Sequence, residues 1–221
     1  MAEKYGTIPP KFTKAWWEYF WLYYKWHTII TLFVIICIAF TFYQRITTEK
    51  YDVTLTYAGY STFPEETVEE ISSSLSPLCE DVDENGEKRL RFSNITFLED
   101  DSNPNYNMAM YTKLQLSLSS DEVYLYIIDK NLIDAFLGDN ALSSAFEPVE
   151  NWYKGTVNSE TAFSKFGKVY GINVSECKTL KNILKEPENH YLLMRYYPTD
   201  NQKKQLKGYN AASKLGTQII G

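Results

Sequence analysis

The hydropathy pattern begins with a long apolar stretch close to the N-terminus. No residue from Trp26 to Gln44 carries a formal charge. As a helix, the 18 residues from Trp26 to Tyr43 would extend about 27 Å, close to the roughly 30 Å of a bilayer's hydrocarbon core. Helices buried in globular cores rarely need this length without a polar face. The pattern therefore predicts a single transmembrane helix.

The residues around this helix predict that it is retained as a signal anchor. A cleaved signal peptide begins with a short basic region and ends at a site of small residues. Here 27 residues precede the apolar run, and the bulky residues Phe40–Tyr43 stand where a cleavage site would be. Three lysines shortly before the helix, against Arg45 and Lys50 after it, favour a cytoplasmic N-terminus.

Aromatic side chains crowd the segment just before the apolar stretch. Eight of the eleven residues from Trp16 to Trp26 are aromatic. Amphipathic rings favour the headgroup level of a membrane, so this segment is interpreted as an interfacial anchor. A docking surface for another membrane protein is the second interpretation. The residues predicted at the membrane interface are Trp16, Trp17, Trp21, Trp26 and Tyr43.

After residue 49 the pattern changes to alternating strands and helices. Polar and apolar residues alternate over 51–57, which predicts a strand, and Val68, Ile71 and Leu75 have helical spacing. Further strands are predicted at 89–98, 123–128, 168–174 and 191–197, and further helices at 103–118, 130–137 and after Asp200. This order predicts an α/β fold: one wound, mostly parallel sheet with flanking helices, preceded by the transmembrane helix.

The run Val123–Ile128 is apolar at every position, which is typical of a central strand buried on both faces. We expect Leu125 and Ile127 on one face of this strand, with Tyr124 and Tyr126 on the other. Asp129 follows at a good capping position for the helix 130–137.

Composition argues against several classes of function. The net charge is −6, with +2 in residues 1–43 and therefore −8 in the remainder, so no basic patch exists for nucleic acid. The two histidines, His27 and His190, stand apart in the sequence, and no nucleophile or nucleotide-binding motif is present. We therefore expect no enzymatic activity and no cofactor. Cys79 and Cys177 are both placed in the outer domain and could pair.

One segment has the beginning of a calcium-binding pattern. Asp81–Gly86 matches the first six positions of a calcium loop, but its twelfth position is Phe92, where a bidentate Glu is required. The favoured interpretation is the Asn-Gly turn of a hairpin, without a metal.

A candidate ligand site follows from the predicted fold. Ligands of open α/β sheets bind at the carboxyl ends of the strands. That edge would carry Gly59, Tyr60, Asp129 and Asn173. Each also has a local explanation, as turn glycine, exposed aromatic, helix cap and strand end.

Three stretches, 120–129, 136–149 and 167–173, together resemble extracytoplasmic solute-binding proteins of bacterial ABC importers. The third, Gly-Lys-Val-Tyr-Gly-Ile-Asn, is similar to the family's GKxYGxP strand, with Asn173 in place of proline. The resemblance implies an α/β lobe outside the cytoplasmic membrane. Only about fifteen residues separate Val174 from the next strand near Tyr191, so a second lobe cannot follow, and hinge closure around a solute is unavailable.

The sequence thus predicts a cytoplasmic tail (1–14), an aromatic segment with a transmembrane helix (15–45) and an extracytoplasmic domain (49–221). The predicted function is a membrane-tethered, non-catalytic module that binds a protein partner or ligand at the cell surface. The alternative is an accessory subunit of a membrane complex, recognised through its aromatic helix. The expected partners are the lipid bilayer and another membrane or cell-surface protein.

The predicted topology can be tested with protease added to intact cells. Protease should remove the residues after about 45 and leave the membrane helix with its N-terminal segment, because the lysines before the helix hold that end inside. Loss of an N-terminal tag, with protection of the C-terminal domain, would reverse the orientation.

Overall fold

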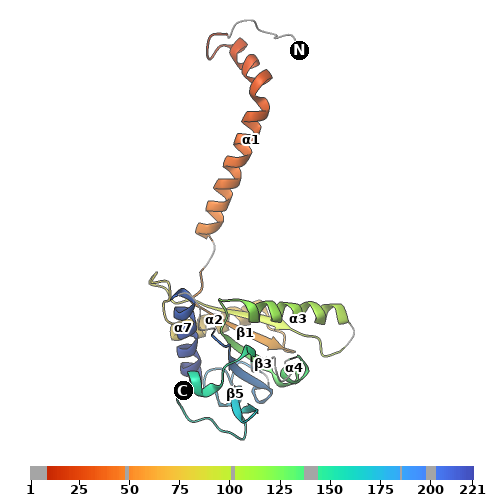
Figure 1. Ribbon diagram of the computed structural model, residues 1–221, viewed down its shortest axis with the longest axis vertical. Coiled ribbons are helices and arrows are strands. Elements are labelled where there is room, and N and C mark those ends of the chain that lie inside the picture. Colours follow the sequence, from red (N-terminus) through yellow and green to blue (C-terminus); the bar gives the residue numbers. More distant parts are fainter. Residues whose placement is uncertain (1–8, 48–49, 101–102, 137–143, 185, 198–202) are drawn as a thin grey trace. The chain divides into compact units, whose positions relative to one another are not determined.

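The computed structural model describes residues 9–47, 50–100, 103–136, 144–184, 186–197 and 203–221. The chain divides into two compact units, Met1–Glu49 and Lys50–Gly221. The first holds a single long helix and the second a sheet with helices on its faces (Figure 1).

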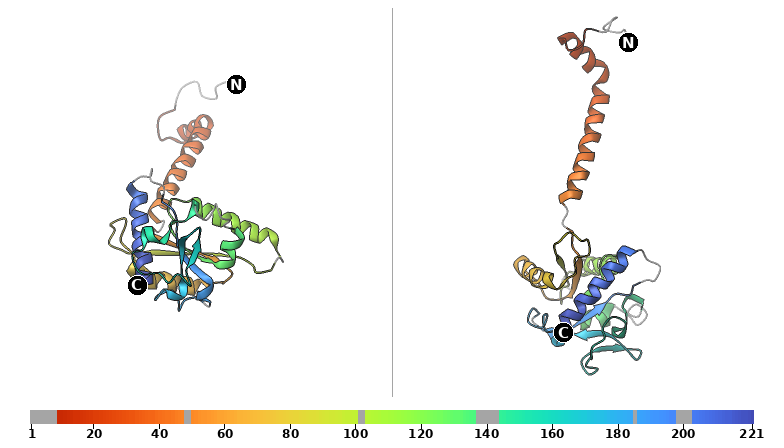
Figure 2. Two further views of the ribbon diagram at one scale, coloured as in Figure 1. Left: turned by 60° about the horizontal axis from the view of Figure 1, so that its bottom comes forward. Right: turned by 90° about the vertical axis from the view of Figure 1, so that its left-hand side faces the viewer.

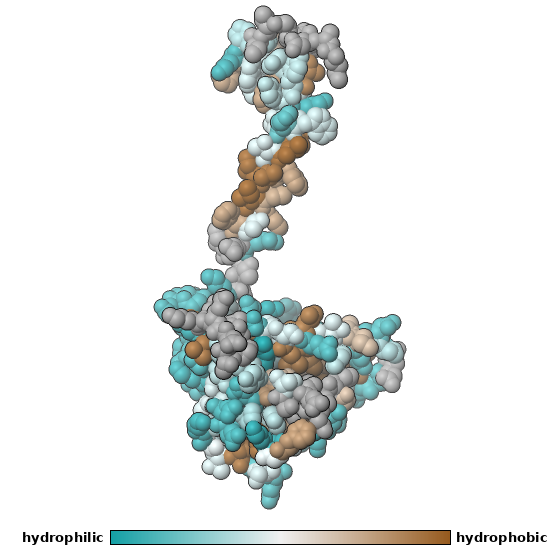
Figure 3. Space-filling view, viewed as in Figure 1, coloured by the Kyte–Doolittle hydropathy of each residue, from teal (hydrophilic) through white to brown (hydrophobic). Residues whose placement is uncertain are grey.

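In its described residues, the first unit contains one helix, α1 (Lys14–Thr47). The Thr13 hydroxyl accepts a hydrogen bond from the Trp16 amide at the start of this helix, which satisfies one of its free N–H groups. With 34 residues α1 extends about 51 Å, and its length and composition suffice to cross a membrane. No part of its most apolar stretch is buried, and Figure 3 shows that stretch as a band of hydrophobic surface.

The second unit is built on a six-stranded sheet in the order β2-β1-β3-β6-β5-β4. The strands are β1 (Val53–Gly59), β2 (Leu90–Thr96), β3 (Leu125–Asp129), β4 (Phe163–Lys165), β5 (Lys168–Asn173) and β6 (His190–Met194). The α/β class of the prediction is confirmed. The mostly parallel sheet is only partly confirmed, because β2, β1 and β3 are parallel to one another whereas β6, β5 and β4 pair antiparallel.

The connections on either side of β5 contain no helix long enough for a parallel crossover in the described residues. A parallel neighbour needs a crossover of a dozen or more residues, usually a helix. Instead β4 and β5 are joined by Phe166 and Gly167, which both have positive φ angles, as a two-residue hairpin turn requires. The segment between β5 and β6 forms only the short 3₁₀ helices η2 (Val174–Glu176) and η3 (Pro187–Asn189) among its described residues. Strand β4 was not predicted from the sequence.

Helices cover both faces of the sheet. On one face α2 (Glu65–Leu75), α6 (Val149–Trp152) and α7 (Lys203–Ile220) pack against a core that includes Leu55, Leu125 and Leu192. On the other face α3 (Pro104–Ser119) and α4 (Lys130–Phe136) pack around Tyr126 and Ile128. Figure 2 shows α7 in blue and α3 in green on opposite sides of the strands.

Strand β3 is central, as predicted, because β1 and β6 flank it and all five of its residues are buried. Leu125 and Ile127 belong to the first core and Tyr126 to the second. The expectation for Tyr124 is wrong. This residue precedes the strand and packs in the same core as Leu125, where its ring contacts Tyr209 of α7.

Removal of the Leu125 side chain tests this central position. Among the described residues, both cores are formed by residues of the second unit, so a soluble fragment 50–221 can be used for the measurement. Leu125→Ala should lower the free energy of unfolding by about 2–5 kcal/mol, because the truncation leaves a cavity at a fully buried position. Leu116→Ala on the exposed face of α3 is the control and should cost little. Equal melting temperatures for the two variants would contradict the sheet order.

Candidate functional site

The chain reverses its winding direction at the boundary between β1 and β3. From β1 the chain passes through α2 to β2 on one side of β1, and from β2 it returns through α3 to β3 on the other side. Ligands of such sheets bind outside the carboxyl ends of the strands at this point. The four predicted residues lie at this edge, because Gly59, Asp129 and Asn173 end β1, β3 and β5, and Tyr60 follows Gly59.

Three polar side chains meet at this edge on the face covered by α2 and α7. Tyr57 of β1 shares its face with Leu55, Asp129 with Ile127, and His190 of β6 with Leu192, because side chains alternate along a strand. Asp129 and His190 are directly opposite each other across the antiparallel pair. We name Tyr57, Asp129 and His190 the edge cluster.

The edge cluster is held by a defined set of hydrogen bonds. His190 Nδ1 lies 2.7 Å from the Glu186 carbonyl oxygen, which can only accept, so this nitrogen carries a proton. In the neutral imidazole Nε2 is then an acceptor, and it lies 3.0 Å from the Tyr57 hydroxyl, which donates to it. The same hydroxyl oxygen accepts a hydrogen bond from the Ser61 amide at 3.0 Å.

Asp129 completes the edge cluster and has the predicted capping role. Its Oδ1 accepts a hydrogen bond from the Asn131 amide at 2.8 Å in the first turn of α4. Its Oδ2 lies 3.8 Å from His190 Nε2, which is too long for a hydrogen bond but close enough for charge attraction. Asp129 and His190 are 6% and 3% exposed, so both groups are shielded from solvent.

Burial raises the pKa of the Tyr57 phenol, although the hydrogen bond from Ser61 acts in the opposite direction. Partial burial and the negative charge of Asp129 also raise the pKa of Tyr60. Both phenols are therefore protonated at neutral pH, and neither can act there as a base. The Tyr57 hydroxyl and the His190 imidazole thus belong to one connected set of hydrogen bonds with the Ser61 amide and the Glu186 carbonyl.

The structure separates the four predicted residues into two pairs. Gly59 and Asp129 lie on the side of the edge cluster. Tyr60 packs with Phe97 in the second core. Asn173 lies on the same face as Tyr60, because it pairs with Tyr191 of the second core. Its side chain donates a hydrogen bond to the Glu188 carbonyl and accepts one from the Ser175 amide. Asn173 therefore ties η2 and η3 to the strand end.

Sequence reasoning missed Tyr57 and His190. Tyr57 is part of the apolar alternation of β1 and is indistinguishable there from a core aromatic residue. His190 stands 61 residues from Asp129 along the chain, and only the pairing of β3 with β6 brings the two together. A contact between a histidine in one buried strand and a capping aspartate at the end of another leaves no recognisable pattern in the sequence.

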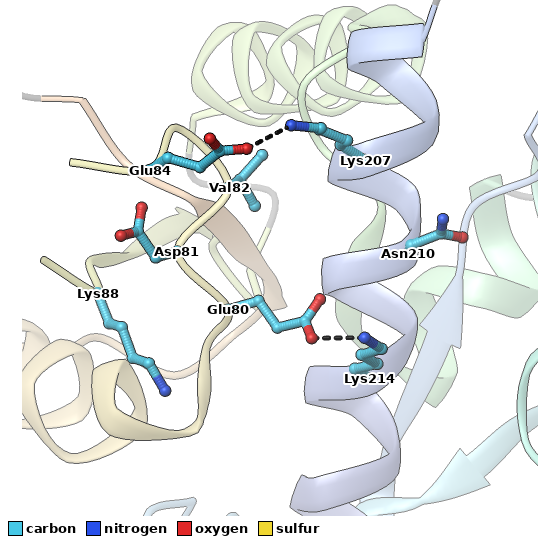
Figure 4. A pocket seen from close by; sticks show the side chains of 8 residues that line it. All are labelled: Glu80, Asp81, Val82, Glu84, Lys88, Lys207, Asn210 and Lys214. Atoms are coloured by element: carbon cyan, nitrogen blue, oxygen red, sulfur yellow. Dashed lines mark hydrogen bonds and ion pairs between the residues drawn. The ribbon is translucent and has the colours of Figure 1, made fainter. Parts of the chain in front are cut away.

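A second candidate site is a charged cleft between the loop 80–88 and α7. It has a volume of about 520 Å³, with Glu80, Asp81 and Glu84 on the loop side and Lys207, Asn210 and Lys214 on the helix side (Figure 4). Ion pairs cross it between Glu84 and Lys207 at 2.9 Å and between Glu80 and Lys214 at 2.5 Å. Exposed pairs of this kind contribute little stability, so they hold the loop only weakly.

The loop beside this cleft carries the acidic groups that could hold a metal ion. Carboxylate oxygens of Asp52, Asp81 and Asp83 lie within 4.8 Å of one another, and oxygen ligands suit calcium. Asp52 already accepts hydrogen bonds from the backbone amides of Val82 and Arg89. Asp81 accepts hydrogen bonds from the backbone amides of Asn85 and Gly86. These hydrogen bonds, chiefly that from Gly86, lower the pKa of Asp81. The predicted hairpin is wrong, because no strand leads directly into this loop in the described residues.

The two cysteines of the second unit are free. Cys79 and Cys177 are both buried in the first core, where their thiols face the carbonyl oxygens of Leu75 and Asn173 at 3.8 Å. Burial raises the pKa of each thiol to about 12. Neither thiol supplies a nucleophilic thiolate at neutral pH. The suggested disulfide is not formed.

No family model, curated protein or solved structure matches this chain. The resemblance to solute-binding proteins therefore stays a prediction from the sequence.

Gly59 can be used to test how closely the edge cluster is packed. A Cβ atom at this position would collide with the Tyr57 side chain, so Gly59→Ala must displace the phenol from His190. We expect this variant to lose about 1–3 kcal/mol of stability, as overpacked sites do. Gly208→Ala in α7 is the matched control, since its Cβ would make only ordinary contact with Tyr124. Alanine is favoured over glycine inside a helix, so the control should unfold at or above the wild-type temperature. A Gly59→Ala variant as stable as the wild type in thermal unfolding would refute the arrangement.

Proposed function

We propose that this protein is a membrane-anchored, non-catalytic binding module whose globular unit binds a protein partner outside the cytoplasm. The observation that carries the proposal is the division of the chain into a bare apolar helix and a self-contained α/β unit. The Tyr57, Asp129 and His190 side chains of that unit each form hydrogen bonds within the unit. Five residues, 48–52, connect α1 to β1.

The first part of the proposal is the anchor. Large apolar side chains of α1, such as Ile30, Phe33 and Phe40, are exposed along its whole middle section. Water would penalise this surface by about 25 cal/mol per Å² of apolar area, whereas lipid would not. Exposed Trp17, Trp21 and Tyr43 at the two ends of the apolar stretch support interfacial positions. With the N-terminus in the cytoplasm, residues 49–221 lie outside the cell.

The second part is binding without catalysis. The globular unit has one histidine, and it is buried and hydrogen-bonded to Tyr57 and Glu186. The two thiols are buried, and burial raises the pKa of each. General acid–base or nucleophilic catalysis needs such groups within reach of a substrate.

The outer face of α3 supports a protein partner. This helix has one charged residue, Lys113, among its 16 residues. Met108 and Leu116 are 65% and 68% exposed. A neutral, partly apolar helix face is typical of surfaces that other proteins cover. Residues 50–221 form one compact unit, and closure on a small solute needs two, so we favour a macromolecular ligand for this unit.

The alternative function, an accessory subunit recognised through its membrane helix, is supported by the aromatic segment. Trp16, Phe20 and Tyr24 form a stacked row on one side of α1, with ring centroids 5.4 and 5.6 Å apart. A rigid row of rings is a suitable contact surface for another membrane helix.

Crosslinking followed by pull-down distinguishes the two functions. The fragment 50–221 should capture a protein partner without α1, and Met108→Glu with Leu116→Glu should abolish the capture, because a charged residue is costly at a buried interface. Substitution of Thr112 and Ser119, exposed polar neighbours on the same helix, by Ala is the matched control and should leave capture intact.

The full-length protein tests the alternative. Replacement of Trp16, Trp17, Phe20 and Trp21 by Leu keeps the helix apolar and should not affect capture by the globular unit. If capture is lost with these aromatic residues, and the fragment 50–221 recovers nothing, the accessory-subunit function replaces the first proposal.

A further inference from the structure

The edge cluster places one imidazole nitrogen between two different partners. His190 Nε2 lies 3.0 Å from the Tyr57 hydroxyl and 3.8 Å from Asp129 Oδ2. The hydroxyl suits the neutral imidazole, because it can donate a proton to an acceptor nitrogen. The carboxylate suits the imidazolium, because it accepts a proton and carries the opposite charge.

We infer that His190 is a proton-operated latch that holds the segment Gly59–Phe63 at neutral pH and releases it when the imidazole is protonated. The inference concerns regulation of the proposed binding module, and in that respect it rests on the proposed function.

In the neutral state the hydrogen bonds form a continuous chain. The Ser61 amide donates to the Tyr57 oxygen, the Tyr57 hydroxyl donates to Nε2, and Nδ1–H donates to the Glu186 carbonyl oxygen. The Tyr57 ring also packs edge-on against Phe63, with centroids 4.8 Å apart. Tyr57 therefore fixes the segment at two points, Ser61 and Phe63.

Protonation of His190 removes the hydrogen-bond acceptor of the Tyr57 hydroxyl. Nε2 of the imidazolium must donate, so the Tyr57 hydroxyl can no longer donate to it. The nearest negative charge is Asp129, and a movement of about 1 Å would turn the 3.8 Å separation into a charge-assisted hydrogen bond. The phenol then loses its acceptor and reorients, which weakens its bond to the Ser61 amide. Histidine is the side chain that titrates between about pH 5 and 8.

The groups around the imidazole come from four parts of the fold. Tyr57 faces it from β1, Asp129 from β3, and the Glu186 carbonyl from the segment before β6. Tyr60, in the segment after β1, is near enough for the charge of Asp129 to raise its pKa. Asp129 supplies a carboxylate to this surrounding, and a carboxylate beside an imidazole favours the imidazolium.

The released segment is connected to the proposed docking face. The Phe97 amide donates to the Gly59 carbonyl at 2.8 Å, and the Phe97 ring contacts Tyr60. The next residue, Leu98, exchanges two hydrogen bonds with the Asn107 side chain of α3, at 2.9 and 3.0 Å. A movement of Gly59–Phe63 can thus be transmitted to α3, first through Phe97 and then through the hydrogen bonds between Leu98 and Asn107.

The latch can be tested in the full-length protein in detergent micelles. The chain has two histidines, so ring-labelled histidine gives two NMR signals, and His27→Gln assigns them. The His190 ring signal, followed as the pH is lowered from about 8 to about 5, reports when the imidazole gains its second ring proton. Hydrogen exchange of the Ser61 amide, corrected for its intrinsic pH dependence, should lose about three- to tenfold protection with the same midpoint, as loss of one hydrogen bond predicts.

Two variants make the result specific. Asp129→Asn keeps an oxygen for the α4 cap but removes the charge, so both midpoints should shift together to lower pH. Tyr57→Phe should leave Ser61 unprotected at every pH while His190 still titrates. An imidazole that does not titrate in this range overturns the inference, as does titration without a change at Ser61. No partner takes part in these measurements, so failure of the proposed function would not affect their result.

Discussion

The position of β3 between β1 and β6 is the constraint on which the rest of the globular unit depends. All five residues of this strand are buried, so its two neighbours and the helices on both faces are required to exclude water from it. The parallel pairing with β1 aligns Gly59 with Asp129 at one edge. The antiparallel pairing with β6 places His190 opposite Asp129. The edge cluster is therefore a consequence of strand order.

Buried charge is handled differently at the two ends of the sheet. At the far end Glu147 accepts hydrogen bonds from the Tyr209 hydroxyl at 2.7 Å and the Tyr197 amide at 3.1 Å, which joins α7 to the chain after β6. Both hydrogen bonds are donated to the Glu147 carboxylate, so this contact fixes the position of α7. At the carboxyl edge Asp129 faces a histidine that can change its charge, so two arrangements compete. The Glu147 contact and the proposed pH-dependent contact between Asp129 and His190 thus lie at opposite ends of the same strands.

The two units of the chain place their apolar side chains in different surroundings. The described residues of the globular unit form two cores of their own, one on each face of the sheet. The helix α1 has no core and exposes its apolar side chains, which suits a lipid environment. This division is the physical basis for the proposal of an anchored module, since an apolar helix that completed a soluble core would be covered.

The sequence by itself determined the elements that depend on local periodicity. Examples are the apolar helix, the strand around Leu125, the helix after Pro64 and the capping role of Asp129, because each follows from spacing along a few turns or one strand. Tertiary structure alone decided the direction of the strands after β3 and the separation of Cys79 from Cys177. It also decided the hydrogen bond between Tyr57 and His190. The physical reason is register. Side chains alternate with a period of two, so a slip of one residue in the β3–β6 pairing would move His190 to the opposite face, and no local pattern encodes that pairing.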